Sequence, residues 1–119
     1  NFDWLSNDKD HVDRYIEDKL CGFDVSLQSW LDVAEAVFYA NRNLSMIPPN
    51  FPIFLLGGAQ DPCTNYGKDM KKLAARLERI GHYNCTHKTI ESSRHETLNE
   101  LNREQNAQIF LDWLSAQTN

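Results

Sequence analysis

The sequence predicts an α/β fold, in which a helical segment is followed by the strand, helix, strand and helix of a parallel sheet. Three observations point to it. Residues 52–57 form a continuous apolar run that ends in glycine, which is typical of a strand buried on both faces of a parallel sheet. Three prolines between positions 48 and 52 forbid helix and separate this strand from what precedes it. Apolar residues recur with helical spacing on both sides of the break.

The first third of the chain is predicted to contain two helices. Asn7 or Asp8 can cap a short helix, and Ser26 can cap a second one that runs to about Asn41. On this second helix the spacing i, i+3, i+4 and i+7 places six apolar residues on one face: Leu27, Trp30, Leu31, Ala34, Val37 and Phe38.

After the proline break, the pattern alternates between strand and helix. A helix is expected to stop at Gly81, a second and more polar strand to follow at 85–90 near a sheet edge, and a last helix to begin around Asn102. One face of this last helix is predicted to carry Asn106, Ile109, Phe110, Trp113 and Leu114. Two strands rarely make a stable sheet by themselves, so we expect other strands to complete it.

Composition excludes several classes of protein. The chain has 119 residues, 41% of them hydrophobic and 24% charged, which is typical of one folded domain. A net charge of -5 with scattered basic residues argues against nucleic-acid partners, and no apolar stretch approaches the length of a membrane span. Three cysteines form no disulfide framework, which favours a cytoplasmic location. Because Asn1 is neither an initiator methionine nor part of a signal peptide, we expect the chain to be part of something longer.

Two residues are candidates for catalysis. Asp61 lies just past the carboxyl end of the first predicted strand, and His95 lies just past the second. Catalytic groups of open α/β sheets gather at that edge. There the Asp61 carboxylate would hold the His95 imidazole in one tautomer and stabilise it when it takes up a proton.

The sequence resembles the α/β-hydrolases of the lysophospholipase and monoacylglycerol lipase group. The resemblance is carried by residues 2–6, 20–23, 52–62 and 94–100. It covers only the later half of such an enzyme, and it implies a helical cap (lid) segment at 1–47 and the C-terminal part of the hydrolase core at 48–119. It further implies that Asp61 is the acid and His95 the base of a Ser-Asp-His triad.

The resemblance also implies a function and a partner. The intact enzyme would cleave carboxylic esters of lipid-like substrates, either lysophospholipids or monoacylglycerols, without a metal or cofactor, and loose contact with a membrane surface would suit it. No G-x-S-x-G nucleophile elbow occurs in the sequence, so the nucleophile must come from a missing N-terminal half. None of the serines present has the flanking glycines that such an elbow needs.

Several alternatives remain open. The chain could belong to a peptidase, a thioesterase or an epoxide hydrolase, or it could be an inert fragment that associates with its missing half or with a second copy through the open sheet edge. Trp4, Trp30, Phe38 and Tyr39 could line an acyl-chain pocket or simply pack on the core.

Two further sets of residues carry weaker signals. The close spacing of His82, Cys85 and His87 suggests a metal site, but with no obvious fourth ligand a turn residue and two strand-surface residues are favoured. The role of Glu96 and Glu100 beside the histidine is undecided from the sequence.

Overall fold

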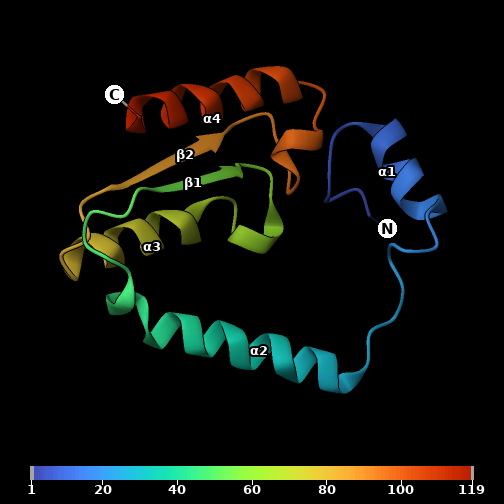
Figure 1. Ribbon diagram of the computed structural model, residues 1–119. Helices are drawn as coiled ribbons and strands as arrows, with labels where there is room; N and C mark the ends of the chain where they lie inside the picture. Colours follow the sequence, from blue (N-terminus) through green and yellow to red (C-terminus); the bar gives the residue numbers. More distant parts are fainter. Residues whose placement is uncertain (1, 119) are drawn as a thin grey trace.

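The structure, a computed structural model that describes residues 2–118, has the predicted order of elements. Helices and strands occur as α1 (Lys9–Glu17), α2 (Leu27–Arg42), β1 (Ile53–Gly58), α3 (Lys68–Arg79), β2 (Cys85–Ile90) and α4 (Arg103–Gln117). Helices α3 and α4 lie on opposite faces of the sheet, whereas α2 stands apart from it (Figure 1). No helix in the described part of the chain is long and apolar enough to cross a membrane.

The two strands pair in parallel, as predicted. Their register runs from Ile53 opposite Cys85 to Gly58 opposite Ile90, so both strands end at the same edge of the sheet. The prediction that the first strand is buried on both faces is only partly correct: residues 53–56 are half-buried, while the two glycines that end the strand are buried. Within residues 2–118 the sheet has these two strands alone, and so narrow a sheet leaves its side chains partly open to solvent.

The predicted helix ends are largely confirmed. The Asp8 side chain accepts a hydrogen bond from the backbone N–H of His11, and the Ser26 side chain accepts one from the N–H of Ser29, as N-caps do. Gly81 adopts a φ of +90°, which an L side chain rarely tolerates, just beyond the end of α3. These local signals therefore set where the helices begin and end.

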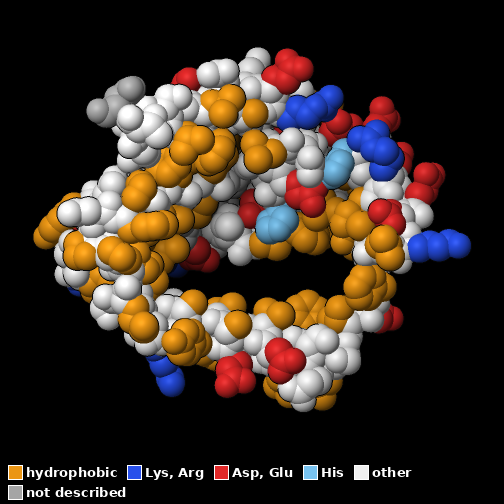
Figure 2. Space-filling view, viewed as in Figure 1, with side chains coloured by type: hydrophobic (Ala, Val, Ile, Leu, Met, Phe, Trp, Pro, Cys, Tyr) orange, Lys and Arg blue, Asp and Glu red, His pale blue; other side chains and the backbone are white. Residues whose placement is uncertain are grey.

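Helix α2 buries none of its residues, so of the two alternatives left open for its aromatic residues, packing on the core is not found in the part of the chain that the structure describes. Trp30 is 62% exposed, and Phe38 and Tyr39 are similarly open. Apolar side chains line the side of α2 that faces the rest of the molecule across an open space (Figure 2). Part of the predicted face of α4 is exposed as well, at Phe110 and Leu114. Both helices present apolar surface that contacts within this chain do not cover.

Part of the core lies on the two faces of the sheet, and Leu5 and Val12 of the N-terminal region are buried as well. Against α3 the core contains Met70, Leu77 and Ile90, which are buried. On the opposite side, the ring of Phe54 stacks on Trp113 of α4, with ring centroids 5.0 Å apart and planes at 14°. Burial of these side chains holds both helices to the sheet and fixes the loops at its carboxyl edge.

Candidate active site

Asp61 is held in one orientation directly after β1. Its side chain is 2% exposed. One carboxylate oxygen, Oδ1, accepts a hydrogen bond of 2.8 Å from the backbone N–H of Cys63, so Asp61 caps the short 3-10 turn at Pro62–Thr64. This bond leaves Oδ2 available to another partner.

That partner is His95. Its Nδ1 lies 3.1 Å from Asp61 Oδ2, which joins the loop after β2 to the loop after β1. The imidazole is 41% exposed, in contrast to the buried carboxylate. A buried carboxylate on Nδ1 fixes the tautomer of the imidazole and leaves the other ring nitrogen free to exchange a proton with a reacting group. The juxtaposition predicted from chain order is therefore present.

The two loops are bound to each other by their backbones as well. The N–H of Ala59 donates to the carbonyl of Ile90 at 2.9 Å, and the N–H of Gln60 donates to the carbonyl of Ser93 at 3.0 Å. A Cβ atom on Gly58 would lie only 2.1 Å from the carbonyl oxygen of Arg94. Only glycine allows the chain to pass this close, so Gly58 is required for the loops to meet.

The N-terminal segment, residues 2–8, lies against the histidine loop. The carbonyl of Trp4 accepts from the N–H of His95 at 3.3 Å, and the carbonyl of Leu5 accepts from the N–H of Glu96 at 2.8 Å. The ring of Trp4 also contacts the imidazole, with centroids 5.0 Å apart and planes at 60°. One side of His95 is thus covered by Trp4, which the sequence had suggested only as an acyl-pocket or core residue.

Glu100 has a clear structural role. It is fully buried, and its carboxylate accepts from the N–H of Arg94 at 2.7 Å and from the N–H of Asn7 at 3.0 Å. The Asn7 side chain donates to it as well. Hydrogen bonds to an ionised acceptor are stronger than neutral ones, so Glu100 clamps the N-terminal segment to the histidine loop.

Glu96 has a different and more exposed role. Its Oε2 lies 2.5 Å from Nε2 of His11 on α1 and accepts a hydrogen bond from the Asn99 side chain. It therefore ties α1 to the loop that carries His95.

Cys63 belongs to the same site, although sequence reasoning missed it. Its thiol, the Asp61 carboxylate and the His95 imidazole each offer one ligand atom, and these three atoms lie within 4.8 Å of one another. Desolvation of the thiol by neighbouring groups, and next the negative charge of Asp61 and a hydrogen bond to its carboxylate, raise the pKa of the exposed Cys63 thiol. The signal available in the sequence was its position two residues after the candidate acid.

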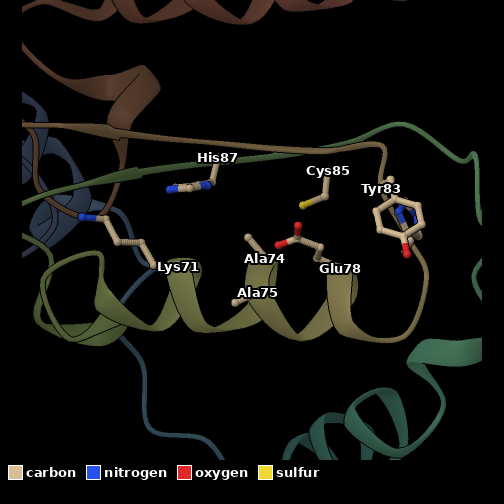
Figure 3. Close-up of a pocket in the computed structure, with 8 residues that line it drawn as sticks. Lys71, Ala74, Ala75, Glu78, Tyr83, Cys85 and His87 are labelled. Atoms are coloured by element: carbon tan, nitrogen blue, oxygen red, sulfur yellow. The ribbon is translucent and has the colours of Figure 1, made fainter.

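His82, Cys85 and His87 are among the residues that line a pocket of about 350 Å³ between α3 and β2. Cys85 and His87 project from β2 toward α3, as alternation along one strand predicts (Figure 3). Their ligand atoms do not form a close group with those of His82, since the group found among the described residues is the one at Asp61. His82 lies directly after the turn at Gly81, as interpreted, and its N–H donates to the carbonyl of Leu77 at the end of α3. It is nevertheless buried, at 2% exposed, and both of its ring nitrogens lie away from solvent.

Two of the predicted non-nucleophilic serines are buried in structural positions. The Ser6 hydroxyl donates to the carbonyl of Asn99 at 2.9 Å. The Ser93 hydroxyl accepts from the Asn106 side chain, which is itself buried and also donates to the carbonyl of Thr97. These bonds hold the histidine loop against α4.

The parallel strand pair, its flanking helices and the polar loops at its carboxyl edge constitute part of an α/β-hydrolase fold. The family model described as serine aminopeptidase, S33, matches residues 1–102, and the chain belongs to this family of α/β-hydrolases. A search of curated proteins gives no match.

Proposed function

We propose that Asp61 and His95 are the acid and the base of a Ser-Asp-His triad in a hydrolase that cleaves carboxylic esters. The observation that carries this proposal is the 3.1 Å contact between His95 Nδ1 and Asp61 Oδ2. It joins a buried carboxylate to a half-exposed imidazole at the edge of the sheet where such enzymes hold their catalytic groups.

The reaction follows from this arrangement. A serine supplied by a segment outside these residues attacks the ester carbonyl while His95 accepts its proton. His95 then donates that proton to the leaving alcohol, and water repeats the cycle on the acyl-enzyme. Asp61 keeps the imidazole oriented and stabilises its positive charge. The missing N-terminal half that carries the nucleophile is thus the main partner in the proposal.

For the substrate we propose a lipid-like ester, such as a lysophospholipid or a monoacylglycerol. Support comes from the sequence resemblance and from a groove of about 570 Å³ between α1 and α2, whose lining includes Phe2, Tyr15, Phe23 and Trp30. Apolar lining of this kind suits an acyl chain. In the same proposal, residues 1–47 form the cap and 48–119 form part of the core, and the protein is cytoplasmic with contact at a membrane surface.

The rival proposals make different demands on the same residues. A peptidase, as the description of the family suggests, or a thioesterase would use Asp61 and His95 in the same roles on another acyl substrate, whereas an epoxide hydrolase would need an aspartate nucleophile. An inert fragment would use neither residue and would associate through the unpaired edge of β1 with its other half or with a second copy.

The test uses the active protein that contains this chain. His95→Gln is expected to abolish turnover of a monoacylglycerol ester, and Asp61→Asn to lower kcat by about 10⁴-fold, since the amide stabilises the wrong tautomer. Asp69→Asn, at an exposed carboxylate on α3, is the matched control. Ester turnover by His95→Gln at the unsubstituted rate would refute the assignment.

A second experiment separates enzyme from inert fragment. Native mass spectrometry and labelling with a fluorophosphonate are applied to the same purified sample. A labelled serine on a companion polypeptide supports the triad, while a lone chain or homodimer without label supports the fragment. Cleavage of amino-acid amides in preference to lipid esters would favour the peptidase.

A further inference from the structure

The strongest unassigned feature is the set of three ligand types beside Asp61. Carboxylate, thiol and imidazole come from Asp61, Cys63 and His95, and the ligand atoms all lie within 4.8 Å of one another. Zinc is bound in proteins by just these three side-chain types. We propose that Asp61, Cys63 and His95 form a site for a zinc ion, and that occupation of this site withdraws the acid and base from catalysis.

The geometry is close to what the ion requires. Bonds of about 2.0–2.3 Å in a tetrahedral site place neighbouring ligand atoms about 3.3–3.8 Å apart. The observed spacing is therefore met by movements of about 1 Å. Asp61 is anchored by the Cys63 N–H, and Cys63 sits on the same short turn, so two of the ligands are already positioned by local structure.

Solvent access and charge agree with this assignment. Cys63 is exposed and His95 is 41% exposed, so an ion can enter and a water molecule can take the fourth position. One carboxylate and one thiolate balance the two positive charges of zinc. On binding, the Cys63 S–H bond breaks, its proton passes to solvent, and the sulfur donates its electron pair to the ion. The imidazole stays neutral: its ligating nitrogen gives up its proton to solvent and the other ring nitrogen takes one up, so that the lone pair of the ligating nitrogen is directed at the ion. No oxidation or reduction is involved.

The structure favours this group over the cluster of His82, Cys85 and His87. The latter residues supply similar ligand types, but their ligand atoms do not approach one another as closely. Their cysteine provides the matched control for an experiment.

Binding is tested directly on the reduced, metal-free protein with Co²⁺, which reports tetrahedral and thiolate coordination through its visible and near-ultraviolet absorption, followed by competition with Zn²⁺. We expect one ion per chain. Loss of even an outer-shell partner of a metal ligand weakens binding by about 10–100-fold. Cys63→Ser and His95→Gln are therefore expected to weaken Co²⁺ binding by at least about tenfold, and Cys85→Ser to change it by less than about twofold.

Other outcomes would overturn the proposal. Absence of the thiolate band, or its loss in Cys85→Ser with retention in Cys63→Ser, would show that this site does not exist. Circular dichroism of each variant checks that it folds, and Cys63→Ala, which also removes the thiol at an exposed position, must reproduce the result of Cys63→Ser.

The proposal that a bound zinc ion inhibits catalysis rests on the proposed function, whereas the proposal that the ion binds at Asp61, Cys63 and His95 does not. A protein that binds Co²⁺ through Cys63 and hydrolyses no ester would refute the hydrolase assignment alone. An active esterase without the thiolate band would refute the metal site alone.

Discussion

The backbone N–H of Arg94, the residue directly before the candidate catalytic His95, donates a 2.7 Å hydrogen bond to the buried carboxylate of Glu100. The same carboxylate receives the N–H of Asn7 from the other end of the sequence. His95 is therefore placed by two constraints, the carboxylate of Asp61 on its ring and the carboxylate of Glu100 on the backbone beside it.

Replacing Glu100 by Gln is expected to destabilise the fold by about 1–3 kcal/mol, because the amide nitrogen cannot accept from a backbone N–H and one buried donor loses its partner. Urea unfolding measures the change. Glu104→Gln, at an exposed position on α4, is the control and should stay within about 0.5 kcal/mol. Equal free energies of unfolding for the two variants would contradict the role of Glu100 in holding the N-terminal segment to the histidine loop.

Gly58→Ala is expected to cost at least about 2 kcal/mol, since its Cβ would collide with the backbone carbonyls of Ser93 and Arg94, which cannot move without opening the site. Gly57→Ala is a matched control one residue earlier. Its Cβ would meet the Met70 side chain, whose flexible end can shift. The thermal unfolding temperature of Gly58→Ala should therefore be well below that of Gly57→Ala. The reverse order of the two temperatures would contradict the proposed role of Gly58.

The thiol of Cys63 is expected to react faster with iodoacetamide in Asp61→Asn. Desolvation and the Asp61 charge raise the pKa of this thiol. Removing the charge lowers the pKa and so increases the thiolate fraction at a pH below the pKa. Mass spectrometry of the alkylated peptides gives the rates over a pH series. Cys85, whose pKa is raised by burial alone, is an internal control and should react at an unchanged rate.

Trp30→Ala tests the proposed acyl-chain groove. In the active protein, kcat/KM for a long-chain monoacylglycerol should fall by more than that for an acetyl ester, because only the long chain reaches the apolar groove. The free energy of unfolding should change by less than about 0.5 kcal/mol, since Trp30 is largely exposed.

Asp32→Ala, on the opposite side of α2, is the control for that experiment. Equal losses for both esters in Trp30→Ala would remove the support that the groove gives to a lipid substrate.

The candidate acid–base pair was predictable because it depends on chain order. Parallel strands end at the same edge of a sheet, so residues that follow consecutive strands are brought together whatever the detailed packing. Predicting the contact of Asp61 with His95 therefore required little more than the positions of the two strands in the sequence.

The surroundings of the pair were not predictable in this way. Trp4 contacts His95, and Asn7 contacts Glu100, and the two residues of each pair are more than 90 positions apart in the sequence. No local periodicity encodes such contacts. Cys63 was missed for a related reason, since a lone cysteine has meaning only when its neighbours in space are known.

By itself, the sequence determined the order of helices and strands and the cap at Ser26, and it narrowed the first cap to Asn7 or Asp8, because these depend on interactions among near neighbours in the chain. Chain order determined the edge of the sheet at which Asp61 and His95 lie. Burial was decided only by the tertiary structure. The apolar face of α2 stays exposed, while Glu100 and His82 are buried. Hydrophobic periodicity shows which face of a helix is apolar, but burial of that face depends on whether another surface packs against it in the folded structure.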